Sequence, residues 1–312
     1  MLEQIWDRLM AAKHIVLISH VHPDGDTLGS CIGLYHALKQ NGKKTTLFNA
    51  AIEDLPREFR FLSGYEKITN KLPKEFDLIV SCDCGSFDRL GIQKGVYELI
   101  NVDHHKTNTY FGSLNLVDDT FASVGALIYG MLQKNGVKIS KKSAEAFYAS
   151  LGDDTGFFRY GKVNAKTFQI ASELIECGAD AQKVAKYIKA DESLAKVRLR
   201  AFVLQHFCLH HNALIASVII DQKVIAQTGA KRSDTKNMII ELRNLSSVKV
   251  AIMILEQLHN YKVSLRSDGD IDVSKIAQSY GGGGHYASAG FEIKTSEPQK
   301  LLENIIKKVT CK

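Results

Sequence analysis

The chain has 312 residues, 45% of them hydrophobic and 24% charged, with a formal net charge of +6, which is typical of a globular protein long enough for two domains. No apolar run is long enough to span a bilayer, and the N-terminal segment is charged where a signal peptide would be apolar, so we expect a cytoplasmic protein with no membrane partner. Six scattered cysteines argue against a disulfide framework, and the mildly basic charge favours an anionic ligand without identifying it.

Strand-like and helix-like segments alternate in the first half of the chain. Four apolar runs have the length of a strand: 14–19, 44–48, 76–82 and 97–102. Residues 26–40 have helical spacing closed by Asn41 and Gly42, and several helical segments follow residue 122. This order predicts an α/β domain in which a parallel sheet carries helices on both faces.

A second set of strand-like and helix-like segments fills the rest of the chain. Strand-like runs occur at 213–220, 248–257, 261–267 and 290–293, separated by helical stretches and one glycine run. They predict a smaller α/β domain with a mixed sheet. We place the boundary so that the domains are 1–190 and 191–312, and expect a helical, semi-rigid connection near 190–200 and a cleft between the domains.

Three of the apolar runs in the first half end in the same way, with acidic and imidazole side chains directly after the run. These side chains are, in chain order, His20, Asp24, Asp26, Asp83, Asp103, His104 and His105. Because the carboxyl ends of parallel strands converge on one crevice of an open sheet, we expect the side chains to meet there. Asp153 and Asp154 add two further carboxylates.

This mixture of carboxylates and imidazoles indicates a metal site. Hard oxygen ligands together with imidazole suit Mn²⁺ best, with Mg²⁺ as the alternative. The number of candidate ligands exceeds the need of one ion, whereas two ions ~3.5–4 Å apart require a bridging carboxylate and terminal ligands of this kind. Such a pair can hold a hydroxide nucleophile and stabilise the charge that develops on a phosphate ester.

Four segments, HVHPDGDTLGS, SCDCG, NVDHH and GDDTGFF, resemble in order and spacing the motifs of the DHH phosphoesterase family. Nearer the C-terminus, SLRSDGDIDVSKIAQSYGGGGHYASAG is similar to the DHH-associated domain with its glycine-rich GGGH loop. Together the matches bracket residues 20–290. The short length and the lack of further domains most resemble the bacterial nano-RNase and pAp phosphatase branch.

The resemblance implies a role for each matching residue. It implies that one ion is held by His20 and Asp24, that the other is held by Asp26, His104 and Asp154, and that Asp83 bridges both. It also implies that Asp103 orients a histidine, and that His105 contacts the scissile phosphate or protonates the leaving oxygen. In the C-terminal domain it implies a grip on the substrate's phosphate and terminal nucleotide by Arg266, Ser267, Gly282, Gly283 and His285.

The expected function is that of an exonuclease-type hydrolase of short oligoribonucleotides (nano-RNA), releasing mononucleotides, with a 3′-phosphatase activity on adenosine 3′,5′-bisphosphate. The alternative is a phosphodiesterase acting on cyclic dinucleotides or their linear dinucleotide products. A non-catalytic nucleic-acid-binding module is disfavoured, because it would lack the metal ligands and carry a basic stripe interleaved with aromatics. The expected partners are therefore short RNA, dinucleotides and adenosine bisphosphate, and a homodimer is compatible with the sequence.

Overall fold

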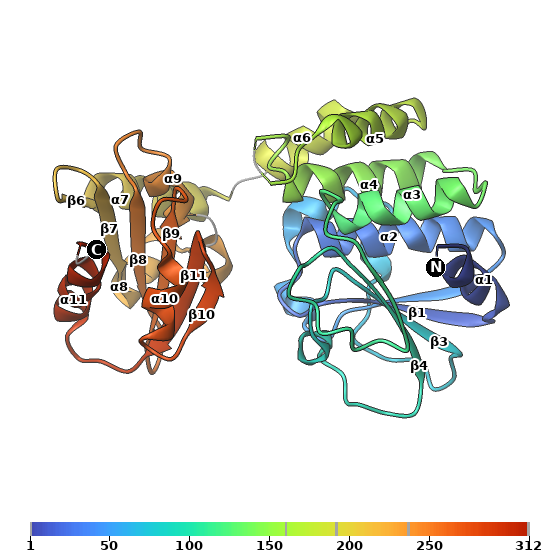
Figure 1. Cartoon of the computed structure of the whole chain (residues 1–312), viewed down its shortest axis with the longest axis horizontal. Coiled ribbons are helices and arrows are strands. Elements are labelled where there is room, and N and C mark those ends of the chain that lie inside the picture. Colours follow the sequence, from blue (N-terminus) through green and yellow to red (C-terminus); the bar gives the residue numbers. More distant parts are fainter. Residues whose placement is uncertain (1, 160, 191–192, 236–237, 311–312) are drawn as a thin grey trace. The chain divides into compact units, whose positions relative to one another are not determined.

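The computed structural model describes residues 2–159, 161–190, 193–235 and 238–310. The chain divides into two compact units, Met1–Asp191 and Glu192–Lys312 (Figure 1). Within the described residues, no helix combines the length and the apolar character needed to cross a membrane.

A five-stranded parallel sheet forms the centre of the first unit, with the order β2-β1-β3-β4-β5. Its strands are β1 (His14–Ser19), β2 (Lys44–Phe48), β3 (Leu78–Cys82), β4 (Glu98–Asp103) and β5 (Leu114–Val117). The first four correspond to the predicted apolar runs. Strand β5 lies at the edge of the sheet and was not predicted, because its four residues are too few to show a periodic pattern.

The helices of this unit are α1 (Leu2–Ala11), α2 (Gly25–Gln40), α3 (Val124–Lys134), α4 (Lys141–Asp154), α5 (Ala165–Glu176) and α6 (Ala181–Ala190). Short 3-10 helices are η1 (Ile52–Asp54), η2 (Arg57–Phe59), η3 (Tyr65–Lys67) and η4 (Phe87–Leu90).

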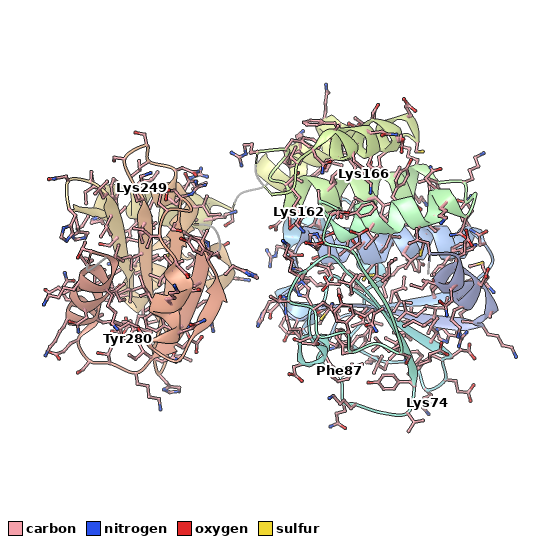
Figure 2. All side chains as sticks on the ribbon, viewed as in Figure 1. Lys74, Phe87, Lys162, Lys166, Lys249 and Tyr280 are labelled. Atoms are coloured by element: carbon pink, nitrogen blue, oxygen red, sulfur yellow. The ribbon has the colours of Figure 1, made fainter. Side chains whose placement is uncertain are left out.

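Alternate residues of the buried strands face two different cores, as a strand requires. Ile15 and Leu17 of β1 pack in the larger core with the α-helices, whereas Val16 and Ile18 pack in a smaller core with η4 and neighbouring loops. Phe87 of η4 lies on the side of the sheet opposite to the α-helices (Figure 2). The predicted α/β class with a helix-flanked parallel sheet is confirmed. Of the helices predicted on both faces, the α-helices pack on one face, and the other face carries the 3-10 helix η4 and loops.

Helices α2 and α4 pack unusually closely, because α2 presents glycines to α4. A Cβ atom on Gly29 would lie 2.5 Å from the carbonyl oxygen of Ala146, and one on Gly33 would lie 2.2 Å from Cε1 of Phe147. Neither position has room for a side chain. The close contact matters for the site, because α2 begins with Asp26 in its first turn and α4 ends at Asp154.

The second unit contains a six-stranded mixed sheet with the order β10-β11-β9-β8-β7-β6, in which β7 and β8 pair in parallel and the other described pairs are antiparallel. Its strands are β6 (Cys208–His210), β7 (Ile215–Ile220), β8 (Val250–Glu256), β9 (Tyr261–Ser267), β10 (Gly283–His285) and β11 (Ser288–Ile293). The predicted mixed sheet is confirmed.

Helices of the second unit are α7 (Leu194–His206), α8 (Gln222–Thr228), α9 (Met238–Arg243), α10 (Val273–Gln278) and α11 (Pro298–Thr310), together with η5 (Arg232–Thr235). They build two cores: α10 and α11 contribute to one, and α7, α8 and α9 contribute to the other. The helical connection expected between the domains falls partly on residues 191–192, which lie outside the described residues.

Candidate metal centre

The carboxyl edge of the parallel sheet gathers the acidic and imidazole side chains that the sequence singled out. His20, Asp83 and His104 directly follow β1, β3 and β4. Together with residues before and within α2, at the end of α4 and after β4, they form three groups whose potential ligand atoms lie within 4.8 Å of one another. The groups are His20, Asp24 and Asp83; Asp26, His104 and Asp154; and Asp83, His104 and His105.

Asp83 lies at the centre of this cluster. Its Oδ2 is 3.5 Å from Nε2 of His20, and its Oδ1 is 3.7 Å from Nε2 of His104. The residue has a positive φ of 59°, a conformation that aspartate tolerates better than bulky residues. Its backbone N–H donates to the carbonyl of Val102 at 2.9 Å, which fixes this turn against β4.

The Oδ1 atom of Asp83 is buried and has no hydrogen-bond partner within the described parts of the chain. An unpartnered buried acceptor costs free energy, and a carboxylate without a compensating cation costs more. Burial raises the pKa of Asp83 well above its ordinary value, and repulsion from Asp26 and Asp24 raises it further. Divalent cations on both sides of Asp83 would remove both penalties, so the residues present fit a metal centre.

Asp154 shows the same strain on the other side of the cluster. Its side chain is 40% exposed at the rim of the cluster, yet desolvation among the neighbouring carboxylates, together with the charges of Asp26 and Asp24, raises its pKa to about 9. Its Oδ2 is 3.5 Å from Nε2 of His104. Neighbouring Asp153 does something different, because its Oδ2 accepts a 2.8 Å hydrogen bond from the backbone N–H of Gly25 and thereby ties α4 to the start of α2.

Asp26 is oriented by a network that the sequence patterns did not reveal. Its Oδ1 accepts hydrogen bonds from the hydroxyls of Ser30 at 3.1 Å and Ser150 at 2.6 Å. The backbone N–H of Val124, at the start of α3, donates to Oδ2 at 2.9 Å. The positive end of the α3 dipole therefore stabilises this carboxylate. Ser123 is the N-cap of α3, and serine is a residue type that commonly begins a helix.

Two histidines of the cluster are held by backbone carbonyls. Nδ1 of His20 is 2.9 Å from the carbonyl oxygen of Val21, and Nδ1 of His104 is 3.2 Å from that of Phe121. A carbonyl can only accept, so we assign the ring proton to Nδ1 in both residues. Each Nε2 then keeps a lone pair directed at the carboxylates, which is the arrangement of a metal-ligating histidine.

The carboxylate of Asp103 binds the imidazole ring of His105. Nδ1 of His105 donates to Oδ1 of Asp103 at 2.8 Å, and Nδ2 of Asn108 donates to Oδ2 at 2.5 Å. The bond to Asp103 raises the pKa of His105. Burial opposes the ionisation of Asp103, but the hydrogen bonds from His105 and Asn108 outweigh it and lower the pKa. Asn108 is a member of this network that the sequence motifs did not indicate.

The residues expected to grip the substrate lie together at one end of the second sheet. Arg266 of β9 is the register partner of Ser288 of β11, and Ser288 is in turn the partner of His285 in β10. Directly opposed residues of antiparallel strands place their side chains on the same face, so the three form one row. Burial lowers the pKa of Arg266, and its Nη1 donates to the carbonyl of Leu265 at 2.9 Å.

The remaining residues that the sequence assigned to substrate binding, Ser267, Gly282 and Gly283, flank that row. Ser267 is buried, and its N–H donates to the carbonyl of Ala287 at 2.9 Å. A Cβ on Gly282 would lie 2.3 Å from the carbonyl oxygen of Gly290, whereas Gly283 has open space beside it. The glycines therefore allow close approach of β10 to β11 and leave part of the backbone accessible.

Two known domain families together match most of the chain. Residues 14–151 match the DHH family N-terminal domain, and residues 212–310 match the DHHA1 domain. The chain is 28% identical to the bifunctional oligoribonuclease and PAP phosphatase NrnA of Bacillus subtilis (strain 168), in a match that covers 93% of each protein.

Solved structures agree with this fold. An exopolyphosphatase-related protein from Bacteroides fragilis superposes with a TM-score of 0.90 at 25% identity, over 98% of this chain and 95% of that one. RecJ from Thermus thermophilus, crystallised with Mn²⁺, gives a TM-score of 0.56 at 13% identity over 98% of this chain and 53% of its own. At that identity the likeness to RecJ shows the fold alone.

Proposed function

The chain belongs to the DHH family of phosphoesterases, and on that premise we propose that it hydrolyses short oligoribonucleotides to mononucleotides and removes the 3′-phosphate of adenosine 3′,5′-bisphosphate. The observation that carries the hydrolase proposal is the carboxylate and imidazole cluster around the buried, unpartnered oxygen of Asp83. The similarity to NrnA over 93% of both chains supports the choice of substrate.

In this proposal the cluster holds two Mn²⁺ ions, with Mg²⁺ as the alternative. His20 and Asp24 hold one ion, Asp26, His104 and Asp154 hold the other, and Asp83 contacts both. His20 and Asp24 form one of the three groups of neighbouring ligand atoms together with Asp83, and Asp26, His104 and Asp154 form another. The third group joins Asp83 to His104 and His105, which supports a shared role for Asp83. Bound ions of this kind supply an activated water and stabilise the charge on a phosphoryl group.

The roles of the protein's own acids and bases follow from their hydrogen bonds. The Nδ1 proton of His105 is engaged by Asp103, so Nε2 is the nitrogen left to contact the scissile phosphate or to protonate the leaving oxygen. Because Asp103 raises the pKa of His105, the imidazolium is favoured near neutral pH. Asp103 therefore acts by holding the ring and its charge in place.

We assign substrate binding to the second domain, with 1–190 as the catalytic domain and 191–312 as the substrate-binding domain. Arg266 offers a bidentate fork to a phosphate, and its row with His285 puts a second donor on the same face. Within the described residues, Arg266 pairs with no carboxylate, so its donors are available to an anion. A cytoplasmic location suits the five described cysteines, which are free thiols.

A ranking of rates tests the proposal. The purified protein with Mn²⁺ is incubated separately with a labelled dinucleotide, a five-mer, a long RNA, a cyclic dinucleotide and adenosine 3′,5′-bisphosphate. We expect the shortest linear RNAs to be cleaved fastest, and the long RNA slowest. Faster cleavage of the cyclic dinucleotide would replace this proposal with the cyclic-dinucleotide alternative.

A further inference from the structure

The proposed function gives no role to Arg89, an exposed residue of η4 that contacts the metal centre. Its Nη2 lies 3.0 Å from Nδ1 and 3.4 Å from Nε2 of His20. The same Nε2 faces Oδ2 of Asp83 at 3.5 Å and Oδ1 of Asp24 at 3.7 Å. A guanidinium thus lies beside the nitrogen that would ligate an ion, yet within the described parts of the chain it forms no ion pair with a carboxylate.

The backbone of Arg89 is fixed against the loop that follows β1. Its carbonyl accepts a 2.8 Å hydrogen bond from the N–H of Val21, and Leu90 beside it is buried in the smaller core. Gly91 ends η4 with a φ of 66°, and a Cβ there would lie 2.4 Å from Cβ of Ala50. The backbone of Arg89 is therefore anchored, whereas its side chain is exposed and can change direction.

The contact of Arg89 with His20 cannot persist once His20 serves as a ligand. Nδ1 of His20 carries its proton toward the carbonyl of Val21, so it cannot accept a hydrogen bond from Arg89. Nε2 is the one acceptor that the ring offers to the guanidinium. When the lone pair of Nε2 is engaged by a metal ion, Arg89 loses this acceptor while its charge remains, since arginine stays protonated.

We propose that Arg89 is a phosphate-binding residue of the catalytic domain, which leaves His20 when that histidine ligates an ion and then contacts the scissile phosphate. This inference rests on the proposed metal-dependent phosphoesterase function. The guanidinium suits the site, because the carboxylates of Asp24, Asp26, Asp83 and Asp154 would balance the charge of two divalent ions and leave no excess positive charge for an anionic substrate. Its planar fork pairs with two phosphate oxygens at once.

The position of His105 agrees with this role. Nδ1 of His105 lies 3.4 Å from Oδ1 of Asp83, and Arg89 contacts His20, whose Nε2 lies 3.5 Å from Oδ2 of Asp83, so both cations lie beside the same carboxylate. A phosphate between them would relieve their repulsion. Arg89 and His105 come from different loops, after β3 and after β4, so they approach the same carboxyl edge of the sheet from separate backbone segments.

The test compares Arg89→Ala and Arg89→Lys with the wild type by titrating Mn²⁺ alone and then inorganic phosphate in the presence of Mn²⁺. We expect Mn²⁺ affinity to be unchanged or slightly increased, because no ligand is lost and a competitor for Nε2 is removed. Phosphate affinity should fall roughly ten- to hundredfold in Arg89→Ala, as expected for loss of a charged hydrogen bond. Arg89→Lys should recover part of it through its charge.

Lys44→Ala serves as the matched control, because it removes one exposed positive charge from the start of β2, at the opposite edge of the same sheet. It should leave both affinities unchanged. A parallel loss of Mn²⁺ affinity in Arg89→Ala and Arg89→Lys would make Arg89 a positioning residue for His20, and unchanged phosphate affinity in both would also overturn the proposal. If the wild type binds Mn²⁺ and phosphate but cleaves no oligoribonucleotide, the substrate proposal fails and the Arg89 result stands.

Discussion

Nδ1 of His105 donates a 2.8 Å hydrogen bond to Oδ1 of Asp103, and Asn108 holds the other oxygen of the same carboxylate. In the Asp-His-His motif, His104 faces the carboxylates of the cluster, whereas His105 is held by Asp103. In the proposed function this difference assigns His104 to a metal ion and His105 to the substrate.

Replacing Asp103 should harm the enzyme less than replacing His104. We expect Asp103→Ala to lower kcat/KM for a dinucleotide by about 10–100-fold, which is typical of a residue that orients another, and His104→Ala to abolish activity. Asp103→Asn should also lower the pKa of His105, so the limb of the pH profile that reports protonated His105 should move to lower pH. Equal and complete loss in Asp103→Ala and His104→Ala, with the first also losing Mn²⁺, would make Asp103 a metal ligand.

Stability of the metal-free protein should fall as pH rises. Asp154 titrates at about 9 in the folded state instead of 3.8, so folding retains a proton that the unfolded chain has lost. Asp154 therefore takes nothing from the stability of the fold below pH 3.8, and the stability decreases progressively as the pH rises from 3.8 toward 9. The raised pKa values of Asp83 and His105 act in the same direction. Melting temperatures measured in chelator should therefore decrease through this window.

Mn²⁺ should reverse this trend, because the ions replace the protons that the carboxylates would otherwise keep. The rise in melting temperature on adding Mn²⁺ should be largest at the alkaline end of the window. Asp154→Asn is the matched control, and it should flatten the pH dependence in chelator because it removes one of the titrating groups. A metal-free melting temperature that stayed level or increased with pH would contradict the assigned electrostatics.

The contact between α2 and α4 should be intolerant of a single added methyl group. Gly33→Ala would place its Cβ 2.2 Å from the ring of Phe147, and overpacking of this kind costs about 1–3 kcal/mol. Urea denaturation would measure the loss of unfolding free energy. The double variant with Phe147→Leu should recover part of it, and a Gly33→Ala protein as stable as the wild type would show that the helices can separate freely.

Most of the parallel sheet and the metal cluster could be predicted because both depend on local patterns. Four strands have long apolar runs, and the site residues follow three of these runs directly, so the rule for the carboxyl ends of parallel strands places them together. His20 after β1 and Asp83 after β3 are examples. The short edge strand β5 and the short strands β6 and β10 offered no comparable pattern.

The supporting residues of the site could not be predicted, because their roles depend on tertiary contacts between distant segments. Ser150 in α4 reaches Asp26 across 124 positions of sequence, and Arg89 contacts His20 across 69. Serine and arginine are common on helices and turns, so neither residue type stands out in a sequence. Asn108 also acquires its role only when β4 and the following loop bring it to Asp103.

Arg266→Ala should damage nucleotide hydrolysis selectively. We expect metal binding to be intact and kcat/KM for a dinucleotide to fall roughly 10–100-fold, because a charged hydrogen bond to phosphate is lost. A generic chromogenic phosphodiester, which has no second phosphate to grip, should be cleaved at nearly the wild-type rate. Equal loss on both substrates would mean that Arg266 serves the chemistry or the fold, and no loss on either would remove it from the binding site.

The decisive measurement is hydrolysis of a labelled dinucleotide by the wild type and by Asp83→Ala, each with Mn²⁺ and with chelator, after circular dichroism has shown that the variant is folded. Asp83 lies between His20 and His104, so in the proposed centre its loss would remove the ligand assigned to both ions. We predict activity only in the wild type with Mn²⁺. Near-normal rates for folded Asp83→Ala, or for the wild type in chelator, would contradict a two-metal centre built on Asp83.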